Sequence, residues 1–192
     1  MHDKPTLRQH MRERLRTLDD TTRKAASAQI AAHLLHHLES RPGKLTLALF
    51  GGLKNEPNLL PHLLPALKAQ GACACFFQIA DGELQPRQVR TLADLQRGQM
   101  NVWEPKSHCP LIPIGSLDLI LVPGLSFTRD GARLGRGGGY YDRLLAHPNC
   151  RAQRLAIAFD LQLVDHLPTE SHDQRVHQII TESGLITTSV PH

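Results

Sequence analysis

The stretch LILVPGLSFTRDGARLGRGGGYYDRLL, residues 119–145, carries the strongest indication of the fold. It opens with an apolar run, which is typical of a strand buried on both faces of a parallel sheet. A glycine-rich loop follows, and YYDRLLAH at residues 140–147 indicates a helix. A strand, a loop and a helix in this order predict a ligand site beyond the carboxyl end of the strand.

The segments on either side continue the alternation of helices and strands. Apolar periodicity predicts helices over residues 3–18 and 21–39, and Asp3 and Pro5 suit the start of the first. The remaining predicted elements are a strand at 44–50, a helix interrupted by prolines at 59–71, and strands at 72–77, 117–127, 154–159 and 184–189. We therefore predict an α/β fold, a single domain over residues 1–192 built as a three-layer sandwich, with a mostly parallel sheet flanked by helices.

Residues 78–113 show neither a helical nor a strand period. We expect irregular structure there, with a short helix at 92–98 and a weak strand or turn around Val89.

Composition indicates an ordinary globular chain. Of its 192 residues, 41% are hydrophobic and 21% are charged, which argues against disorder. The chain has no apolar run of about 18 residues, and its amino terminus lacks the apolar centre of a signal peptide. We expect a cytoplasmic monomer that does not bind membranes.

The four cysteines form no CxxC pair, so we expect buried thiols and no disulfides. The histidines are scattered as well. His33, His36 and His37 share one predicted helix, without a cysteine or carboxylate at ligand spacing, which disfavours a structural zinc site.

The formal net charge of +4 allows an anionic partner. Aromatic residues are only 4% of the chain, too few for the stacking surfaces of single-strand nucleic-acid binders. By charge alone, an anionic small molecule fits as well as a nucleic acid. We expect a small-molecule substrate and no nucleic acid, with a basic nucleic-acid-binding protein as the alternative.

The loop at residues 133–139 has the chemistry of a phosphate site. Its glycines let backbone N–H groups approach a ligand closely. Arg133 and Arg136 add charged donors, and Asp142 is positioned to hold a magnesium ion. GxxxxGK[ST] is absent, so the loop is not a P-loop. The alternative is a structural turn, with the arginines paired to nearby acids and Tyr140 and Tyr141 in the core.

Several separate residues are candidates to complete the site. Lys4 and Arg8 are four apart on one helical face, Glu56 follows the first predicted strand, and Asp173 ends PTESHD. The simpler interpretations are a solvated basic face for Lys4 and Arg8, a solvent-exposed loop acid for Glu56 and a capped turn for Asp173. Ser126 also follows a strand, but Thr128 replaces the second glycine of GxSxG, which disfavours a hydrolase triad.

Residues 119–145 resemble, almost residue for residue, the signature of the 5-formyltetrahydrofolate cyclo-ligase family, also called methenyltetrahydrofolate synthetases. Weaker matches are KPTLR at 4–8, NEPNLLPHL at 55–63, EP at 104–105 and LPTESHDQRVHQIITESG at 167–184. The departures fall mostly at 78–103, where Trp103 stands in place of a smaller aliphatic residue. His177 also replaces a common aspartate.

The resemblance implies an activity. The family cyclises 5-formyltetrahydrofolate to 5,10-methenyltetrahydrofolate, using ATP and Mg²⁺ and releasing ADP and phosphate. ATP phosphorylates the formyl oxygen, and N10 then attacks the resulting iminium phosphate.

The resemblance also implies roles for individual residues. Arg136 and Tyr140 would be catalytic, facing the transferring phosphate and the formyl group. ATP would be bound by Lys4, Arg8, Arg133, Leu134, Gly135, Arg136, Gly137, Gly138, Gly139, Tyr140 and Tyr141. The folate would contact Gly51, Glu56, Arg136, Gly137, Gly138, Gly139 and Tyr140. Asp142 and Asp173 would hold magnesium.

Two other functional classes stay open. A sugar-phosphate isomerase or CoA-transferase-like enzyme on the same fold would use Glu56 as a general base and need no ATP. A nucleic-acid-binding or folate-binding protein would show no turnover, and nucleic-acid binding would weaken steeply with salt.

Overall fold

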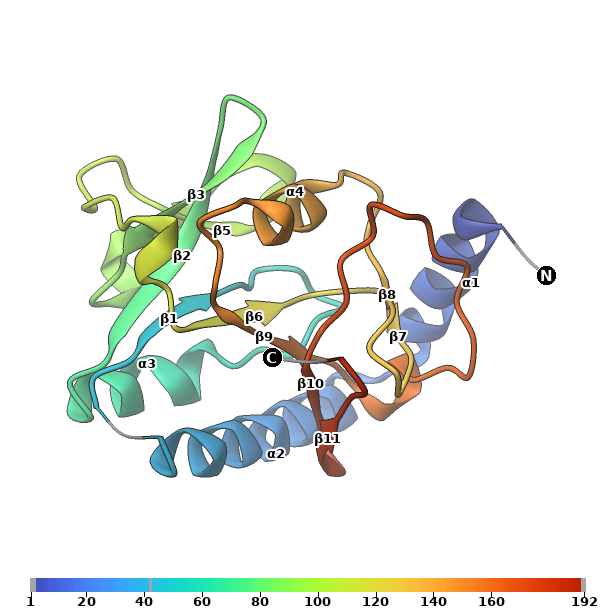
Figure 1. The fold of residues 1–192 in the computed structure, drawn as a ribbon. Helices are drawn as coiled ribbons and strands as arrows, with labels where there is room; N and C mark the ends of the chain where they lie inside the picture. Colours follow the sequence, from blue (N-terminus) through green and yellow to red (C-terminus); the bar gives the residue numbers. More distant parts are fainter. Residues whose placement is uncertain (1–2, 42, 191–192) are drawn as a thin grey trace.

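The computed structural model describes residues 3–41 and 43–190, and a seven-stranded sheet forms its centre (Figure 1). The strands are β1 (Thr46–Leu49), β2 (Cys73–Ala80), β3 (Glu83–Gln88), β6 (Leu119–Val122), β9 (Gln153–Ile157), β10 (Gln178–Thr181) and β11 (Gly184–Thr187). They lie in the order β11-β10-β9-β6-β1-β2-β3. The five inner strands are parallel, and β11 and β3 are antiparallel edges. The predicted mostly parallel sheet is confirmed.

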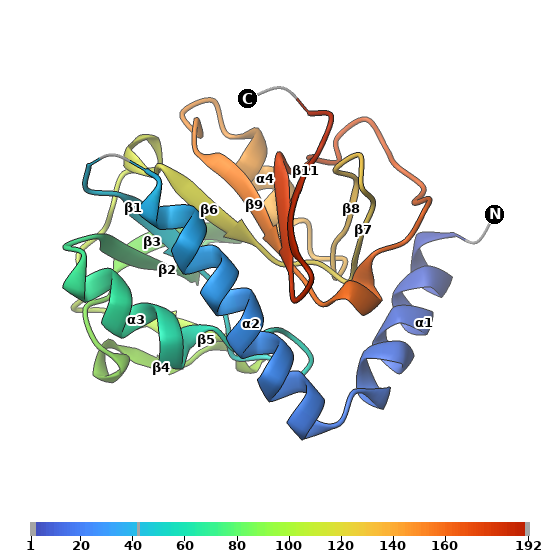
Figure 2. The same cartoon turned by 90° about the horizontal axis from the view of Figure 1, so that it is seen from below.

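Helices lie on both faces of this sheet. They are α1 (Lys4–Thr17), α2 (Asp20–Glu39), α3 (Leu60–Ala69) and α4 (Tyr140–Ala146). Figures 1 and 2 show α2 and α3 on one face and the short α4 on the other, while α1 lies to one side near β7 (Ser126–Phe127) and β8 (Arg133–Leu134). This confirms the three-layer α/β sandwich.

Local sequence explains where the first two helices begin. The Asp3 carboxylate accepts a hydrogen bond from Thr6 N at 3.0 Å, and Asp19 accepts one from Thr22 N at 2.9 Å. Such N-caps satisfy backbone donors that have no partner within the helix. The predicted start of the first helix at Asp3 is confirmed.

The core lies on both sides of the sheet, which explains why the inner strands are apolar throughout. Along β6, Leu119 and Leu121 belong to the core under α1, α2 and α3, whereas Ile120 and Val122 belong to the core on the α4 side. All four are buried. A strand covered on both faces cannot show polar alternation.

Residues 78–113 are more regular than predicted. β2 and β3 form a hairpin, and a second hairpin joins β4 (Leu95–Arg97) to β5 (Trp103–Pro105). The predicted helix at 92–98 is wrong, since only Leu92–Asp94 makes a 3₁₀ turn. Pro86 lies within β3, which a sheet tolerates only because β3 is an edge strand.

The predicted strand at 117–127 is two strands. β6 ends at Val122, and β7 turns away to pair with β8. Pro123 and Gly124 make this break, and a Cβ on Gly124 would lie 2.6 Å from the Phe127 ring. β10 was not predicted at all, and it has only two apolar residues, Ile179 and Ile180, between Gln178 and Thr181.

The predicted interruption of the helix at 59–71 is also wrong. α3 is continuous, with Pro61 in its first turn and Pro65 inside it. Its apolar face buries Leu60, Leu63 and Leu67, and this packing holds the helix together across the missing N–H of Pro65.

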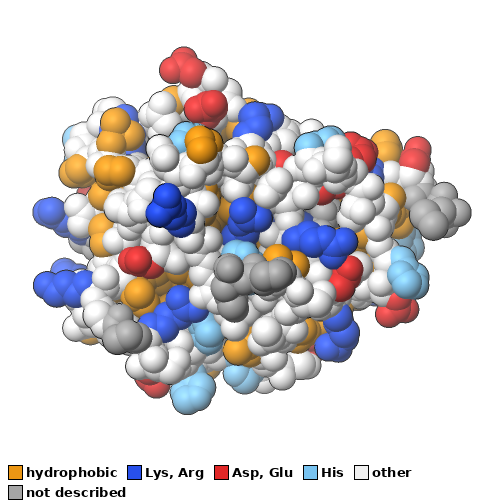
Figure 3. Space-filling model, in the orientation of Figure 1, with side chains coloured by type: hydrophobic (Ala, Val, Ile, Leu, Met, Phe, Trp, Pro, Cys, Tyr) orange, Lys and Arg blue, Asp and Glu red, His pale blue; other side chains and the backbone are white. Residues whose placement is uncertain are grey.

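Other expectations concern thiols, membranes and surface charge. The four cysteines are free, with Cys75 and Cys109 buried as predicted and Cys73 and Cys150 half-buried. Among the described residues, none of the helices has the length and apolarity needed to cross a membrane. On the face drawn in Figure 3, lysines and arginines are interspersed with acidic and uncharged side chains and form no continuous basic patch.

Candidate active site

A pocket opens at the carboxyl ends of β1 and β6. The chain runs from β1 to β2 on one side and later returns to β6 on the other, so the strand order reverses between β1 and β6. Ligands of open α/β sheets bind at such switch points. The pocket volume is about 560 Å³, within the usual range for small-molecule sites. Every residue that the sequence predicted for the site lines this pocket.

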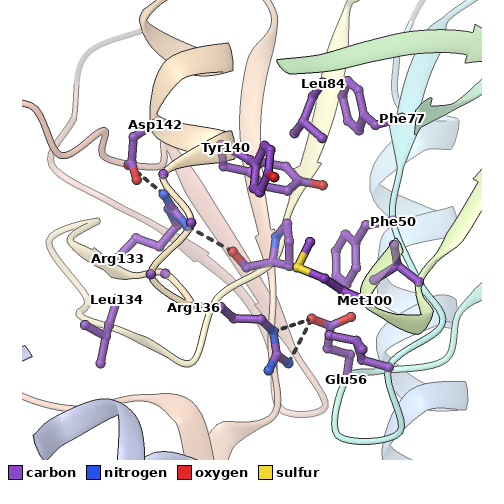
Figure 4. A pocket seen from close by; sticks show the side chains of 18 of the residues that line it. Phe50, Glu56, Phe77, Leu84, Met100, Arg133, Leu134, Arg136, Tyr140 and Asp142 are labelled. Carbon is purple, nitrogen blue, oxygen red and sulfur yellow. Dashed lines mark hydrogen bonds and ion pairs between the residues drawn. The ribbon is translucent and has the colours of Figure 1, made fainter. Parts of the chain in front are cut away.

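The pocket has a polar half and an apolar half (Figure 4). The polar half is formed by the glycine-rich loop at residues 133–139, by Lys4 and Arg8 of α1, and by Asp142 and Asp173. The apolar half is lined by Phe50, Leu53, Phe77, Ile79, Leu84, Met100, Val102 and Trp103. Figure 4 shows Tyr140 between Leu84 and Phe77 on one side and the loop on the other, with Arg136 pointing toward Glu56. This division suits a ligand with one charged and one flat apolar part.

The loop from β8 to α4 needs glycine for two separate reasons. Gly137 and Gly139 have φ values of 110° and 66°, in the region that favours glycine. A Cβ on Gly138 would lie 2.9 Å from the Tyr140 ring, so the backbone there has no room for a side chain. The loop therefore presents bare backbone to the pocket.

The amino-terminal helix packs against this loop although they are distant in sequence. Arg8 Nε donates to the carbonyl oxygen of Gly135 at 3.0 Å, and Arg12 Nη2 donates to that of Arg136 at 3.2 Å. The sequence-based prediction missed Arg12, although its spacing of four from Arg8 places both on one helical face. α1 thus closes the polar half from outside the sheet.

The two aspartates each pair with a cation in this structure. Asp142 Oδ1 lies 2.6 Å from Arg133 Nη2, and the Arg133 side chain is only 4% exposed. Asp173 Oδ2 lies 2.7 Å from Lys4 Nζ. Burial raises the pKa of Asp173, but hydrogen bonds from Lys4 and from the Glu170 backbone outweigh it and hold that pKa below its ordinary value. Carboxylate oxygens of this kind are the hard ligands that Mg²⁺ prefers, so the residues fit the ion.

Arg136 and Glu56 form an ion pair where the two halves meet. Glu56 is 6% exposed, and its Oε1 lies 3.1 Å from Arg136 Nε and 2.9 Å from Nη2. Burial raises the pKa of Glu56, and the Arg136 charge opposes this only in part. The ionised carboxylate is therefore held at some expense to stability.

This pair predicts a pH dependence of folding. The folded-state pKa of Glu56 is above its ordinary value of 4.5, so its stabilising contribution is complete below pH 4.5 and is lost as pH rises through the folded pKa. Urea unfolding of the wild type and Glu56→Gln between pH 4 and 8 should show the wild type losing stability relative to the variant as pH rises. A stability difference that stays constant with pH, or that shifts in favour of the wild type as pH rises, would contradict the raised pKa of Glu56.

The loop after β1 is held closely against β5. Trp103 N donates to the carbonyl oxygen of Gly51 at 3.0 Å. Gly52 has a φ of 109°, and a Cβ on it would lie 2.6 Å from Trp103 N. This contact brings Trp103, from the segment with no readable pattern, into the wall of the pocket.

Gly52→Ala should accordingly be strongly destabilising. We expect a loss of about 2–4 kcal/mol, from the positive φ together with the steric overlap against β5. Gly43 is the matched control, since its φ is 85° but no atom lies within 4 Å of its would-be Cβ. Gly43→Ala should cost only about 1 kcal/mol. Equal losses in denaturant unfolding would show that the contact with Trp103 is unimportant.

Comparison with known proteins identifies the family. A model of the 5-formyltetrahydrofolate cyclo-ligase family matches residues 1–182. The chain belongs to this family. The resemblance inferred from residues 119–145 is thereby confirmed.

Individual cyclo-ligases match over different lengths. The 5-formyltetrahydrofolate cyclo-ligase of Mus musculus is 28% identical over 191 residues, which cover 93% of each chain. That of Mycolicibacterium smegmatis is 46% identical over 83 residues, which cover 43% of each chain. The solved structure of Aquifex aeolicus 5,10-methenyltetrahydrofolate synthetase superposes with a TM-score of 0.77 at 26% identity, covering 98% of this chain and 94% of the other.

One group of potential metal ligands lies outside the pocket described above. Among the described residues, ligand atoms of Asp94, His108 and Cys109 lie within 4.8 Å of one another. Asp94 Oδ2 already accepts the backbone N–H groups of Arg90 and Thr91, and the Cys109 thiol donates to the Asp94 carbonyl oxygen at 3.7 Å. These hydrogen bonds account for the close approach of the three side chains as part of a hydrogen-bonded turn. His33, His36 and His37 do not belong to this group.

Proposed function

We propose that this protein catalyses the ATP-dependent cyclisation of 5-formyltetrahydrofolate to 5,10-methenyltetrahydrofolate, releasing ADP and phosphate. The observation that carries the proposal is the position of Arg136, where a glycine-rich phosphate loop meets an apolar pocket half. Membership of the cyclo-ligase family supports the choice of substrate.

The reaction explains why a phosphate site and an apolar site must adjoin. The formamide oxygen on N5 is a poor leaving group. Transfer of the γ-phosphoryl group to that oxygen produces an iminium phosphate and ADP, and attack by N10 closes the five-membered ring. Loss of phosphate and of the N10 proton then leaves the methenyl product. The protein needs no covalent nucleophile, since alignment and charge neutralisation supply the catalysis.

ATP would occupy the polar half. We assign Lys4, Arg8 and the loop at residues 133–141 to its binding, with the loop contributing backbone N–H groups. The Arg133 guanidinium is buried against Asp142, so we assign it the task of holding that carboxylate in place. Arg136, whose side chain is less enclosed, is better suited to contact the transferring phosphoryl group.

Asp142 and Asp173 are the proposed magnesium ligands. When bound, the ion would reduce the negative charge of the phosphates. The Lys4 pair with Asp173 would loosen when ion and nucleotide bind, whereas Arg133 bonds only Oδ1 of Asp142 and would keep that carboxylate in place.

The folate would place its ring system in the apolar half, near Gly51, Glu56 and Tyr140. Phe50, Phe77 and Trp103 line this half and suit a flat heterocycle. We propose Arg136 and Tyr140 as catalytic residues because both lie at the boundary with the phosphate loop. We further propose that residues 1–192 act as one domain, as a cytoplasmic monomer.

The deciding experiment mixes the purified protein with 5-formyltetrahydrofolate, ATP and magnesium and follows the absorbance of the methenyl product. Omission of ATP or magnesium should abolish the signal. No product over a broad pH range would refute the proposal. Turnover of a sugar phosphate or acyl-CoA without ATP would favour the isomerase or transferase alternative. Strongly salt-dependent nucleic-acid binding without turnover would favour the binding-protein alternative.

A further inference from the structure

A two-stranded ribbon forms one wall of the apolar half of the pocket. β1 pairs with β2 only as far as Phe76. Beyond that point β2 pairs with β3 alone, up to a turn at Asp81 and Gly82, whose φ values of 52° and 77° are those of a type I′ hairpin. Figure 1 shows this ribbon projecting past the sheet. Phe77, Ile79 and Leu84 on the ribbon line the pocket.

A two-stranded ribbon is only marginally stable by itself, and this one packs Phe77 and Leu84 in a core cluster with Leu144 and Leu145 of α4. The position of the wall therefore depends on what holds the tip. Arg143 Nη2, from α4, donates to the carbonyl oxygen of Gly82 at 2.9 Å. Phe77 adds an edge-to-face contact with Tyr141, with ring centroids 5.9 Å apart. Both supports come from α4, the helix that follows the phosphate loop.

The same guanidinium also holds the phosphate loop. Arg143 Nη1 donates to the carbonyl oxygen of Gly138 at 3.2 Å, and the group lies 5.0 Å from the centroid of the Tyr140 ring. A spacing of three residues places Arg143 and Tyr140 on one face of α4. One side chain thus bridges two segments of the pocket that are more than 50 residues apart in sequence.

We propose that Arg143 is a positioning residue that ties the tip of the β2–β3 ribbon to the phosphate loop. It keeps the apolar wall at the distance from the loop that the flat ring of the substrate requires. This inference rests on the proposed function. Arg143 contacts neither ATP nor the folate, but it sets how well the folate fits the pocket.

The planar fork of arginine suits this task, since its two terminal nitrogens donate to two carbonyl oxygens at once. Arg143 is exposed, and so are its hydrogen bonds to Gly82 and Gly138. Its removal leaves both carbonyls in water, where they remain solvated. Arg143→Ala therefore folds. The phosphate loop keeps its hydrogen bonds from Arg8 and Arg12, so the ribbon is the segment that becomes free to move.

Kinetics of Arg143→Ala separate positioning from a general structural role. If only a fraction of molecules hold the ribbon in place, the apparent affinity for the folate falls to that fraction of its full value. We expect KM for 5-formyltetrahydrofolate to rise about tenfold, which corresponds to about 1.4 kcal/mol, while kcat and KM for ATP change less than twofold. A merely structural role would lower kcat and leave KM unchanged. That result, or an unchanged KM, overturns the proposal.

Two further variants sharpen the kinetic test. Arg143→Lys has a single terminal nitrogen and should give a KM between those of the wild type and Arg143→Ala. A KM equal to the wild type would show that a charge alone suffices and would refute the bridge. Arg175→Ala is the matched control, because Arg175 joins Asp130 at 2.7 Å across 45 residues but does not line this pocket. It should leave KM unchanged.

Hydrogen exchange tests the same bridge without turnover. Backbone amides at residues 79–84 should exchange faster in Arg143→Ala than in the wild type and in Arg175→Ala. Equal exchange would overturn the proposal. If the wild type failed to turn over 5-formyltetrahydrofolate, the proposed function would fall, yet the exchange result would still decide whether Arg143 holds the ribbon.

Discussion

Arg136→Ala should lower kcat for methenyl formation about 10³-fold. An arginine that neutralises a transferring phosphoryl group is worth that factor or more. Arg136 reaches the boundary of the two pocket halves from the glycine loop, where such a group would pass. Steady-state and single-turnover measurements at saturating ATP and folate would show whether the chemical step itself is slowed.

The ion pair with Glu56 complicates this variant in a way that can be controlled. Removing Arg136 leaves the buried Glu56 carboxylate without its partner, which destabilises the protein. The double variant Arg136→Ala with Glu56→Gln removes that unpaired charge, so it should recover stability without recovering activity. Thermal unfolding separates the two effects. If the double variant regained wild-type turnover, Arg136 would have no role in catalysis.

Asp142→Asn should raise the magnesium concentration required for half-maximal activity by at least about tenfold. Asparagine keeps the shape and an oxygen for Arg133 but removes the charge that the ion would need. Magnesium titrations at fixed ATP would measure the change, and ATP binding without magnesium should be affected much less. An unchanged magnesium requirement would contradict the assignment of Asp142 as a ligand.

The truncation Asp142→Ala tests the same carboxylate as a structural partner. Arg133 would then be a buried cation without its carboxylate, and breaking such a pair costs about 3–5 kcal/mol. Asp142→Asn should lose markedly less free energy of unfolding than Asp142→Ala. Asp130 is the control, because it pairs with Arg175 in an exposed position outside the pocket. Asp130→Asn should change the free energy of unfolding by less than about 1 kcal/mol.

Much of the fold was predictable because its elements leave local patterns. Asp3 begins the first helix as expected, and the apolar runs of the inner strands indicated a sheet covered on both faces. The antiparallel ribbon and β10 were not predictable in this way. Pro86 masks β3 as a strand, and β10 has only two apolar residues between polar ones, although all four are buried.

Residues 119–145 by themselves determined that a glycine-rich loop follows a buried strand, and they determined the family. Glycine spacing and residue chemistry are local properties, so they can be read without coordinates. Only the tertiary structure decided that Arg133 is buried against Asp142, that α1 packs on the loop, and that Arg143 bonds to Gly82 at the tip of the β2–β3 ribbon. Arg8 and Arg143 reach backbone carbonyls that are distant in sequence, and Arg133 pairs with a side chain of the helix that follows the loop. Their partners follow from how the sheet and helices pack, and no periodicity in the chain encodes them.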